Sequence, residues 1–77
     1  MTDTLIGLFA EVLNVDAFSL NDDSSPDNVS EWDSLAAMML VSAVEGRFQV
    51  QLSTKEIMKM SSIGLARQAL QAKGIDV

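Results

Sequence analysis

The sequence predicts an all-α fold, a small four-helix bundle with three longer helices, one short helix and a long loop between the first two helices. Apolar residues recur at intervals of three and four in three segments, which is the period of a helix with one buried face. Serine and aspartate residues stand just before these segments, where they can cap a helix. A strand-like alternation occurs at residues 49–52, but it has no partner strand. With 77 residues, we expect one free-standing domain, 1–77.

The first helix is expected to run from about Asp3 to Asn14, with Thr2 as its N-cap and Asp3 near the positive end of the helix dipole. Its apolar side chains fall at helical spacing and predict one buried face. That face comprises Leu5, Leu8, Phe9 and Val12, widened by Ile6, Leu13 and Val15.

Residues 16–33 are predicted to form a long loop, because turn-forming residues are concentrated between Asn21 and Asn28 and Pro26 stops any helix. A loop of this length in a small domain needs anchors. We expect four apolar side chains to pack onto the bundle and hold it, namely Phe18, Leu20, Val29 and Trp32, with Phe18 filling the core.

The second helix is predicted from Asp33–Ser34 to about Phe48, with its buried face formed by Ala37, Leu40, Val41, Val44 and Phe48. Leu35, Met38 and Met39 lie off this face. For Leu35 we favour a surface position. Met38 and Met39 fit two interpretations equally well: an exposed binding surface, for which flexible methionines are suited, or contact with helices on more than one side.

The remaining chain is predicted to hold an extended connection at 49–52 and two further helices. Ser53-Thr54-Lys55-Glu56 is a capping-box pattern that opens a short helix carrying Ile57, Met58 and Met60. Ser61 or Ser62 is expected to cap the last helix, and Gly74 to end it just after Lys73. The buried face of that helix comprises Ile63, Ala66, Ala69 and Leu70.

Composition argues against several classes of function. The chain has no His, no Cys and no Tyr, so it cannot form a Ser–His or Cys–His nucleophilic site, and an enzyme in its own right is the interpretation we favour least. The net charge of −6 argues against a nucleic-acid partner. The longest apolar run, Leu35 to Val41, is far shorter than the roughly 20 residues that cross a bilayer, and no positively charged signal region precedes the first helix. We expect a cytoplasmic monomer without membrane contact.

Charge is distributed unevenly about Ser34. Eight acidic residues and no basic residue precede it, whereas three acidic and five basic residues follow it. An acidic half of this kind can steer the chain toward a basic partner surface. An acidic surface that only keeps a small protein soluble explains the charge equally well.

Ser34 stands at the start of the second helix, where a serine either caps the helix or lies on the surface beside unpaired backbone N–H groups. Asp33 can cap the helix equally well, which would free the Ser34 hydroxyl. A phosphoester on that hydroxyl would lie near the positive end of the helix dipole, although Asp33 would repel it. The residues by themselves leave both roles open and favour the structural one.

Trp32-Asp33-Ser34-Leu35 resembles the Asp-Ser-Leu attachment motif of acyl carrier proteins, in the form with a preceding Trp that is common among stand-alone carriers outside core fatty-acid synthesis. The resemblance extends over the Asp/Ser/Pro-rich loop, Phe48, the Ser-capped short helix and the Ser-Ser-Ile start of the last helix. It implies that Ser34 carries 4′-phosphopantetheine, added from coenzyme A by a Mg²⁺-dependent phosphopantetheinyl transferase, with Asp33 and Leu35 as neighbouring residues of the attachment site.

The resemblance further implies that the cofactor thiol holds an acyl or aminoacyl group as a thioester. A ligase would load this group and a downstream transferase or synthase would receive it, in fatty-acid synthesis or, as we favour, in a specialised lipid or secondary-metabolite pathway. The second helix would dock these enzymes, through Leu35, Met38, Met39, Ser42 and Glu45. Because that helix has few acids and the short helix carries Lys55 and Lys59, where common carriers are acidic, we expect a dedicated partner.

Two alternatives remain at this point. The first is an unmodified helical adaptor that grips a partner helix through the Leu35–Met39 patch. The second is a metal-binding loop, because Asp22, Asp23, Asp27 and Glu31 are close in sequence. This loop lacks the glycine and the alternating spacing of a calcium loop, and Pro26 interrupts it.

Overall fold

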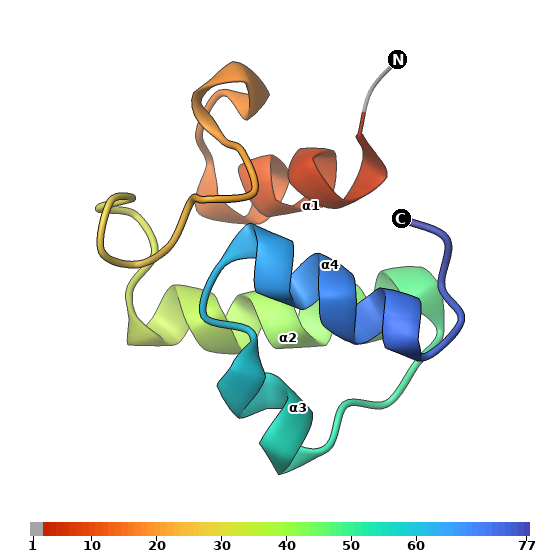
Figure 1. Cartoon of the computed structure of the whole chain (residues 1–77). Helices are drawn as coiled ribbons and strands as arrows, with labels where there is room; N and C mark the ends of the chain where they lie inside the picture. The colour runs from red at the N-terminus through yellow and green to blue at the C-terminus, as the bar shows by residue number, and fades with distance from the viewer. Residues whose placement is uncertain (1–2) are drawn as a thin grey trace.

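The computed structural model describes residues 3–77 and contains four α-helices and one 3₁₀ turn in that range (Figure 1). The elements are α1 (Thr4–Leu13), η1 (Ala17–Ser19), α2 (Ser34–Phe48), α3 (Thr54–Lys59) and α4 (Ile63–Ala72). Residues 3–77 contain no β-strand. The predicted all-α bundle with three longer helices and one short helix is therefore confirmed.

The hydrophobic core is built by the three longer helices. α1 contacts both α2 and α4, while α3 lies at one end and packs on α4 (Figure 1). The fully buried side chains come from α1, α2 and α4, whereas α3 contributes none. The largest of them are Leu5, Phe9, Leu40, Val44, Ile63 and Leu70.

α1 begins one residue later than predicted because Asp3 is its N-cap. The Asp3 Oδ1 accepts hydrogen bonds from the backbone N–H groups of Leu5 (3.0 Å) and Ile6 (3.2 Å), which are two of the four unpaired donors at a helix start. Thr2, the predicted cap, lies outside the described residues. The helix ends at Leu13, one residue before the predicted end, and Asn14 is its C-cap in the left-handed conformation.

α2 has the predicted bounds, but its buried face is rotated toward Ala36. Ala36, Leu40 and Val44 are buried, whereas Ala37, Val41 and Phe48 are half-buried. Ala37 and Val41 pack against the edge of the core and also line a pocket, which explains their partial exposure. The predicted buried face is therefore confirmed for Leu40 and Val44 at the helix centre. At the helix start the buried residue is Ala36 in place of the predicted Ala37.

The loop between α1 and α2 is anchored by Leu20 and Trp32, which are buried, and by Val29, which is half-buried. The prediction that Phe18 fills the core is wrong, since its side chain is 99% exposed. Phe18 lies in the η1 turn, whose cap Asp16 accepts the Phe18 N–H at 2.9 Å. In so short a turn the side chains point in different directions, and here Ala17 is half-buried and Leu20 is buried, whereas Phe18 and Ser19 point outward.

The same loop is tied to the start of α4. The backbone N–H of Ile63 donates to the carbonyl of Ser24 (3.0 Å), and that of Gly64 donates to the carbonyl of Asp22 (2.9 Å). Ser24 is buried, and its hydroxyl accepts the Asn21 N–H at 2.9 Å. These contacts use donors that a helix start leaves unpaired, so they stabilise the loop and α4 together.

Gly64 permits this close approach, and its replacement by alanine is expected to destabilise the fold by about 1 kcal/mol. A Cβ at position 64 would lie 3.0 Å from the Asp22 carbonyl oxygen and 3.2 Å from the Asp22 Cβ, so the tied loop would have to shift. Gly46 in α2 is the matched control, because a Cβ there meets nothing within 4 Å. Gly46→Ala is expected to stabilise the fold by about 0.5–1 kcal/mol through helix propensity. Urea unfolding of both variants measures this, and a stabilising Gly64→Ala would contradict the close packing.

Arg67 of α4 joins two distant acidic residues. Its guanidinium contacts Asp3 at the start of α1 (Nη2–Oδ2 2.7 Å) and Asp22 in the loop (Nη2–Oδ1 2.9 Å). Partial burial raises the pKa of Asp3, but hydrogen bonds from Arg67 and from the backbone N–H groups of Ile6 and Leu5 outweigh it, so the pKa lies below its usual value of 3.8. The same two carboxylates raise the pKa of Arg67.

The Arg67 contacts are expected to make stability depend on acid pH. Because the Asp3 pKa is lower in the folded state than in the unfolded chain, its stabilisation is present above pH 3.8 and is lost as the pH falls through the folded-state value. Arg67→Met should cost about 1 kcal/mol at pH 7 and make the acid dependence shallower. Urea unfolding at pH 7 and at several acid pH values measures both. Arg47→Met is the control, since Arg47 is exposed and forms no ion pair in the described range.

The C-terminal elements follow the predicted signals. Ser53 and Glu56 form the capping box of α3, and Ser62 caps α4. α4 ends at Ala72, followed by Gly74 in the left-handed conformation at φ 86°. The Ser53 N–H and the Lys73 ammonium hold the pKa of Glu56 below its usual value.

Candidate functional site

Ser34 is the first residue of α2, and its hydroxyl is free. Asp33 is the N-cap, and its Oδ1 accepts the backbone N–H of Ala36 at 2.8 Å, as predicted. Ser34 is exposed, and within residues 3–77 its hydroxyl makes no hydrogen bond. The structure thus gives the capping role to Asp33 and leaves the Ser34 oxygen accessible to a partner.

The start of α2 favours an anion on Ser34. The backbone N–H groups in the first turn of a helix carry the positive end of its dipole, and the Asp33 side chain occupies only one of them. The negative charge of Asp33 opposes this effect, because two like charges repel each other at short range. An exposed primary hydroxyl in this position can form a phosphoester whose charge is shared with solvent and with the free N–H groups.

Trp32 fixes the position of this helix start. Its indole is buried and packs edge-to-face on Phe9 of α1, with the ring centroids 5.4 Å apart and an interplanar angle of 75°. Its backbone N–H donates to the carbonyl of Val29 at 3.0 Å. Trp32 therefore anchors the end of the loop against α1 and holds Asp33 and Ser34 at the surface.

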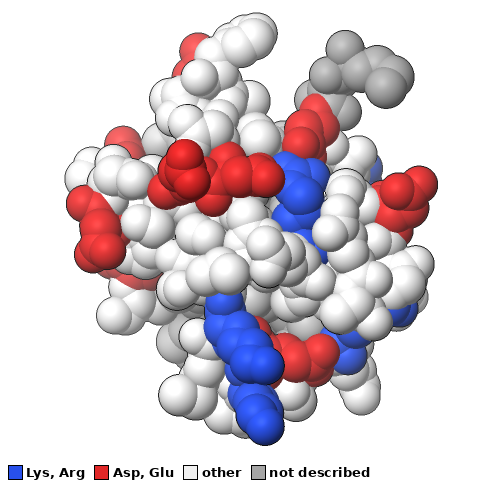
Figure 2. Space-filling view, viewed as in Figure 1, with Lys and Arg blue, Asp and Glu red and all other residues white. Residues whose placement is uncertain are grey.

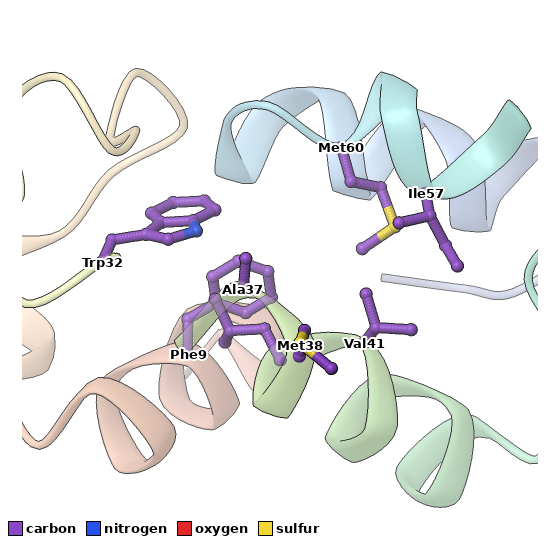
Figure 3. Close-up of a pocket in the computed structure, with 8 residues that line it drawn as sticks. Phe9, Trp32, Ala37, Met38, Val41, Ile57 and Met60 are labelled. Carbon is purple, nitrogen blue, oxygen red and sulfur yellow. The ribbon is translucent and has the colours of Figure 1, made fainter. Parts of the chain in front are cut away.

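An apolar pocket of about 320 Å³ opens between α2 and α3 (Figure 3). Figure 3 shows Met38 and Val41 of α2 opposite Ile57 and Met60, with Trp32 and Phe9 at one end. Met38 follows Ser34 by four residues, which is one helical turn. One residue of the pocket lining therefore lies about one helical turn from Ser34. The lining residues are Phe9, Trp32, Ala37, Met38, Leu40, Val41, Ile57 and Met60.

The predicted partner residues are exposed, with one exception. Leu35, Met38 and Met39 are 67%, 71% and 50% exposed, which decides the position of the two methionines in favour of the surface. Ser42 is also exposed. Glu45 is half-buried, and its Oε2 accepts the backbone N–H of Leu52 at 2.9 Å, so it holds the connection between α2 and α3. Contact of these residues with a partner stays a prediction.

No side chain of α3 was predicted to line a site. Ile57 and Met60 line the pocket, and Met58 is 77% exposed. The shortness of this helix could have indicated that its side chains lie at the surface. A helix of six residues is too short to form a fully buried face, so its apolar residues Ile57 and Met58, and Met60 just after it, remain partly exposed.

The acidic side chains of the loop do not gather into a cluster of potential metal ligands in the part of the chain that the structure describes. Within residues 3–77, no group of three or more potential ligands comes together. Asp22 is paired with Arg67 instead. Along the same residues, no helix has both the length and the apolar character that crossing a membrane requires.

A family model described as the phosphopantetheine attachment site matches residues 3–69, which includes α1, α2, α3 and most of α4. A search of curated proteins found no match to the chain. The family match covers most of the sequence and coincides with an exposed serine at a helix start beside an apolar pocket. The chain therefore belongs to the phosphopantetheine-binding family of acyl carrier proteins, whose prosthetic group is covalently attached 4′-phosphopantetheine.

Proposed function

We propose that Ser34 is the attachment residue and that the protein carries an acyl group to partner enzymes of a specialised biosynthetic pathway. The observation that carries this proposal is the free, exposed Ser34 hydroxyl at the first position of α2, with the capping role taken by Asp33. The surroundings fit the prosthetic group, because the adjacent N–H groups favour its phosphate and the neighbouring surface is apolar.

When bound, 4′-phosphopantetheine supplies the thiol that the chain lacks, since the sequence has no cysteine. The residues of this chain hold the attachment site in place and orient it. Trp32 anchors the loop, Asp33 caps the helix, and Leu35 and Met38 offer an apolar surface beside Ser34. No histidine is present to act as a general base, so we propose that the chain has no catalytic activity of its own.

The pocket between α2 and α3 favours an aliphatic acyl group over an aminoacyl group. Its lining is made of aromatic, aliphatic and methionine side chains, with no carboxylate among them. An ammonium group placed there would lose its hydration without gaining a partner, which is unfavourable. We therefore propose that the enzyme that loads the protein is an acyl-loading ligase. The other proposed partners are a phosphopantetheinyl transferase, which attaches the prosthetic group, and a downstream transferase or synthase, which receives the acyl group.

The proposal is tested by incubating the purified protein with coenzyme A, Mg²⁺ and a broad-specificity phosphopantetheinyl transferase. Intact mass is expected to rise by one phosphopantetheine group, and digestion followed by fragment mass analysis should locate it on Ser34. The absence of a mass gain, or a group located on Ser30 or Ser42, would overturn the assignment. The exposed patch of α2 also suits an unmodified adaptor, and a protein that stays unmodified in this experiment would favour that function.

A further inference from the structure

The indole N–H of Trp32 is the one polar side-chain group among the residues that line the pocket between α2 and α3. The other lining residues are phenylalanine, alanine, leucine, valine, isoleucine and methionine, whose side chains carry no nitrogen or oxygen. Figure 3 shows the indole nitrogen on the edge of the ring that is turned toward the other lining residues. The pocket therefore presents a single side-chain hydrogen-bond donor in an otherwise apolar lining.

This N–H donates to no nitrogen, oxygen or sulfur acceptor within residues 3–77. Trp32 is 5% exposed, and none of the hydrogen bonds in that range involves its side chain. Among the same residues, every side-chain nitrogen or oxygen that is sealed from solvent has a partner, so the unpaired indole N–H opens into the pocket beside it. The edge-to-face contact with Phe9 offers this donor at most the weak acceptor of an aromatic face. An occupant of the pocket is therefore the group that can accept this hydrogen bond.

The charged side chains of the molecule lie outside the pocket. Figure 2 shows acidic side chains over the loop between α1 and α2 and basic side chains over α3, whereas none of the lining residues is charged. An acyl group that ends in a carboxylate would therefore lose its hydration in the pocket without gaining a cationic side chain as a partner, just as an ammonium group would. The occupant that fits is uncharged.

A plain hydrocarbon chain matches the apolar lining but not the Trp32 N–H. When such a chain fills the pocket, it removes solvent from the N–H and offers no acceptor in exchange, which costs the full desolvation of that donor. An oxo group on the chain avoids this cost, because its oxygen accepts a hydrogen bond and it brings no donor of its own. A hydroxyl group is less suitable. Among the lining side chains, its O–H would find only the thioether sulfurs of Met38 and Met60, which are weak acceptors.

We propose that the pocket takes an acyl chain that carries an oxo group, and that Trp32 selects this class of acyl group by donating its indole N–H to the oxo oxygen. The acyl group is the one that the proposed function attaches through Ser34, two residues after Trp32, so this specificity rests on that function. Trp32 then has two separable roles. Its ring anchors the loop on Phe9, and its N–H distinguishes an oxo chain from a plain chain of the same length.

The test uses the single tryptophan of the chain, which gives one indole N–H signal in the NMR spectrum of a ¹⁵N-labelled sample. A broad-specificity phosphopantetheinyl transferase attaches the acyl group together with its prosthetic group, from octanoyl-coenzyme A or from the 3-oxo, 5-oxo and 7-oxo forms of the same chain. The pocket of about 320 Å³ equals roughly ten water volumes of about 30 Å³ each, so eight carbons fit. With at least one oxo chain, the indole signal is expected to move downfield and its exchange with solvent to become roughly tenfold slower than in the octanoyl form.

Thermal unfolding followed by circular dichroism gives a second measurement. In the wild-type protein, the oxo form that shifts the indole signal is expected to have a Tm roughly 5 °C above that of the octanoyl form, since only the oxo oxygen pairs with the N–H. Trp32→Phe keeps an aromatic ring beside Phe9 but has no N–H, so its two loaded forms should unfold at the same temperature. Phe18→Leu is the matched control, because Phe18 is an exposed aromatic residue of the same loop that does not line the pocket. The difference in Tm should persist in this variant.

The outcomes separate this specificity from the proposed function. If no chain is attached to Ser34 of the wild-type protein, the proposed function fails and the specificity fails with it. If the chains are attached and all three oxo forms leave the indole signal where the octanoyl form has it, only the specificity is overturned. A downfield shift that is already present with the prosthetic group alone, attached from coenzyme A, would assign the hydrogen bond to an amide carbonyl of that group and overturn selection of the acyl chain. A difference in Tm that persists in Trp32→Phe would overturn it as well. If that variant does not fold, the indole signal of the wild-type protein decides.

Discussion

Replacing Ser34 with alanine is expected to abolish attachment of phosphopantetheine completely while changing the free energy of unfolding by less than about 0.5 kcal/mol. The loss is expected to be complete because alanine lacks the oxygen that forms the phosphoester. The stability is preserved because Ser34 is exposed, its hydroxyl has no hydrogen-bond partner within residues 3–77, and the cap of α2 is Asp33. Intact mass after incubation with the transferase, and thermal unfolding followed by circular dichroism, measure the two quantities.

Ser61→Ala is the matched control for this experiment. Ser61 is exposed in the connection between α3 and α4, and its replacement should leave both attachment and stability unchanged. Attachment to the Ser34→Ala variant would show that another residue is the acceptor. A large fall in the melting temperature of that variant would show that Ser34 stabilises the helix after all.

Replacing Trp32 with alanine is expected to lower the free energy of unfolding by about 3–5 kcal/mol, more than any other substitution proposed for this protein. The substitution removes a buried ring, its edge-to-face contact with Phe9 and the anchor that holds the loop against α1. For a domain of this size, such a loss lowers the melting temperature by roughly 15 °C or more. Thermal and urea unfolding followed by circular dichroism measure it, since the substitution also removes the only tryptophan fluorophore.

Phe18→Ala provides the comparison, because Phe18 is an aromatic residue of the same loop and is 99% exposed. Its replacement should change the free energy of unfolding by less than about 0.5 kcal/mol. A Phe18→Ala variant that loses as much stability as Trp32→Ala would contradict the exposed position of this ring. A Trp32→Ala variant with unchanged stability would contradict the anchoring role of the indole.

The helices could be predicted because their signals are local. The capping box at Ser53–Glu56, Asp33 before α2 and Gly74 after α4 lie within a few residues of the ends that they define. The position of Phe18 could not be predicted in this way. Both Phe18 and Leu20 are apolar residues of one turn, and only the path of the loop decides which of them points inward.

The site was predicted in part for the same reason. Asp33 and Ser34 are adjacent at a helix start, so local rules name both as candidates for the cap. Which of the two caps α2 follows only from the structure, in which Asp33 accepts the Ala36 N–H. The pocket depends on how α2 and α3 are placed, and no periodicity within either helix predicts it. The contacts of Arg67 with Asp3 and Asp22 span 64 and 45 residues of sequence and were likewise missed.

The absence of any fully buried side chain in α3 has a consequence for how the molecule fluctuates. This helix is held by its capping box, by the Glu56–Lys73 ion pair and by contacts with α4, all of which water can reach. Opening it therefore requires only a small fraction of the free energy of global unfolding. Amide hydrogens of α3 should exchange with solvent faster than those of Leu40 and Val44 at the centre of α2. The wall of the pocket that carries Ile57 is thus expected to open more often than the centre of α2, while the core stays intact.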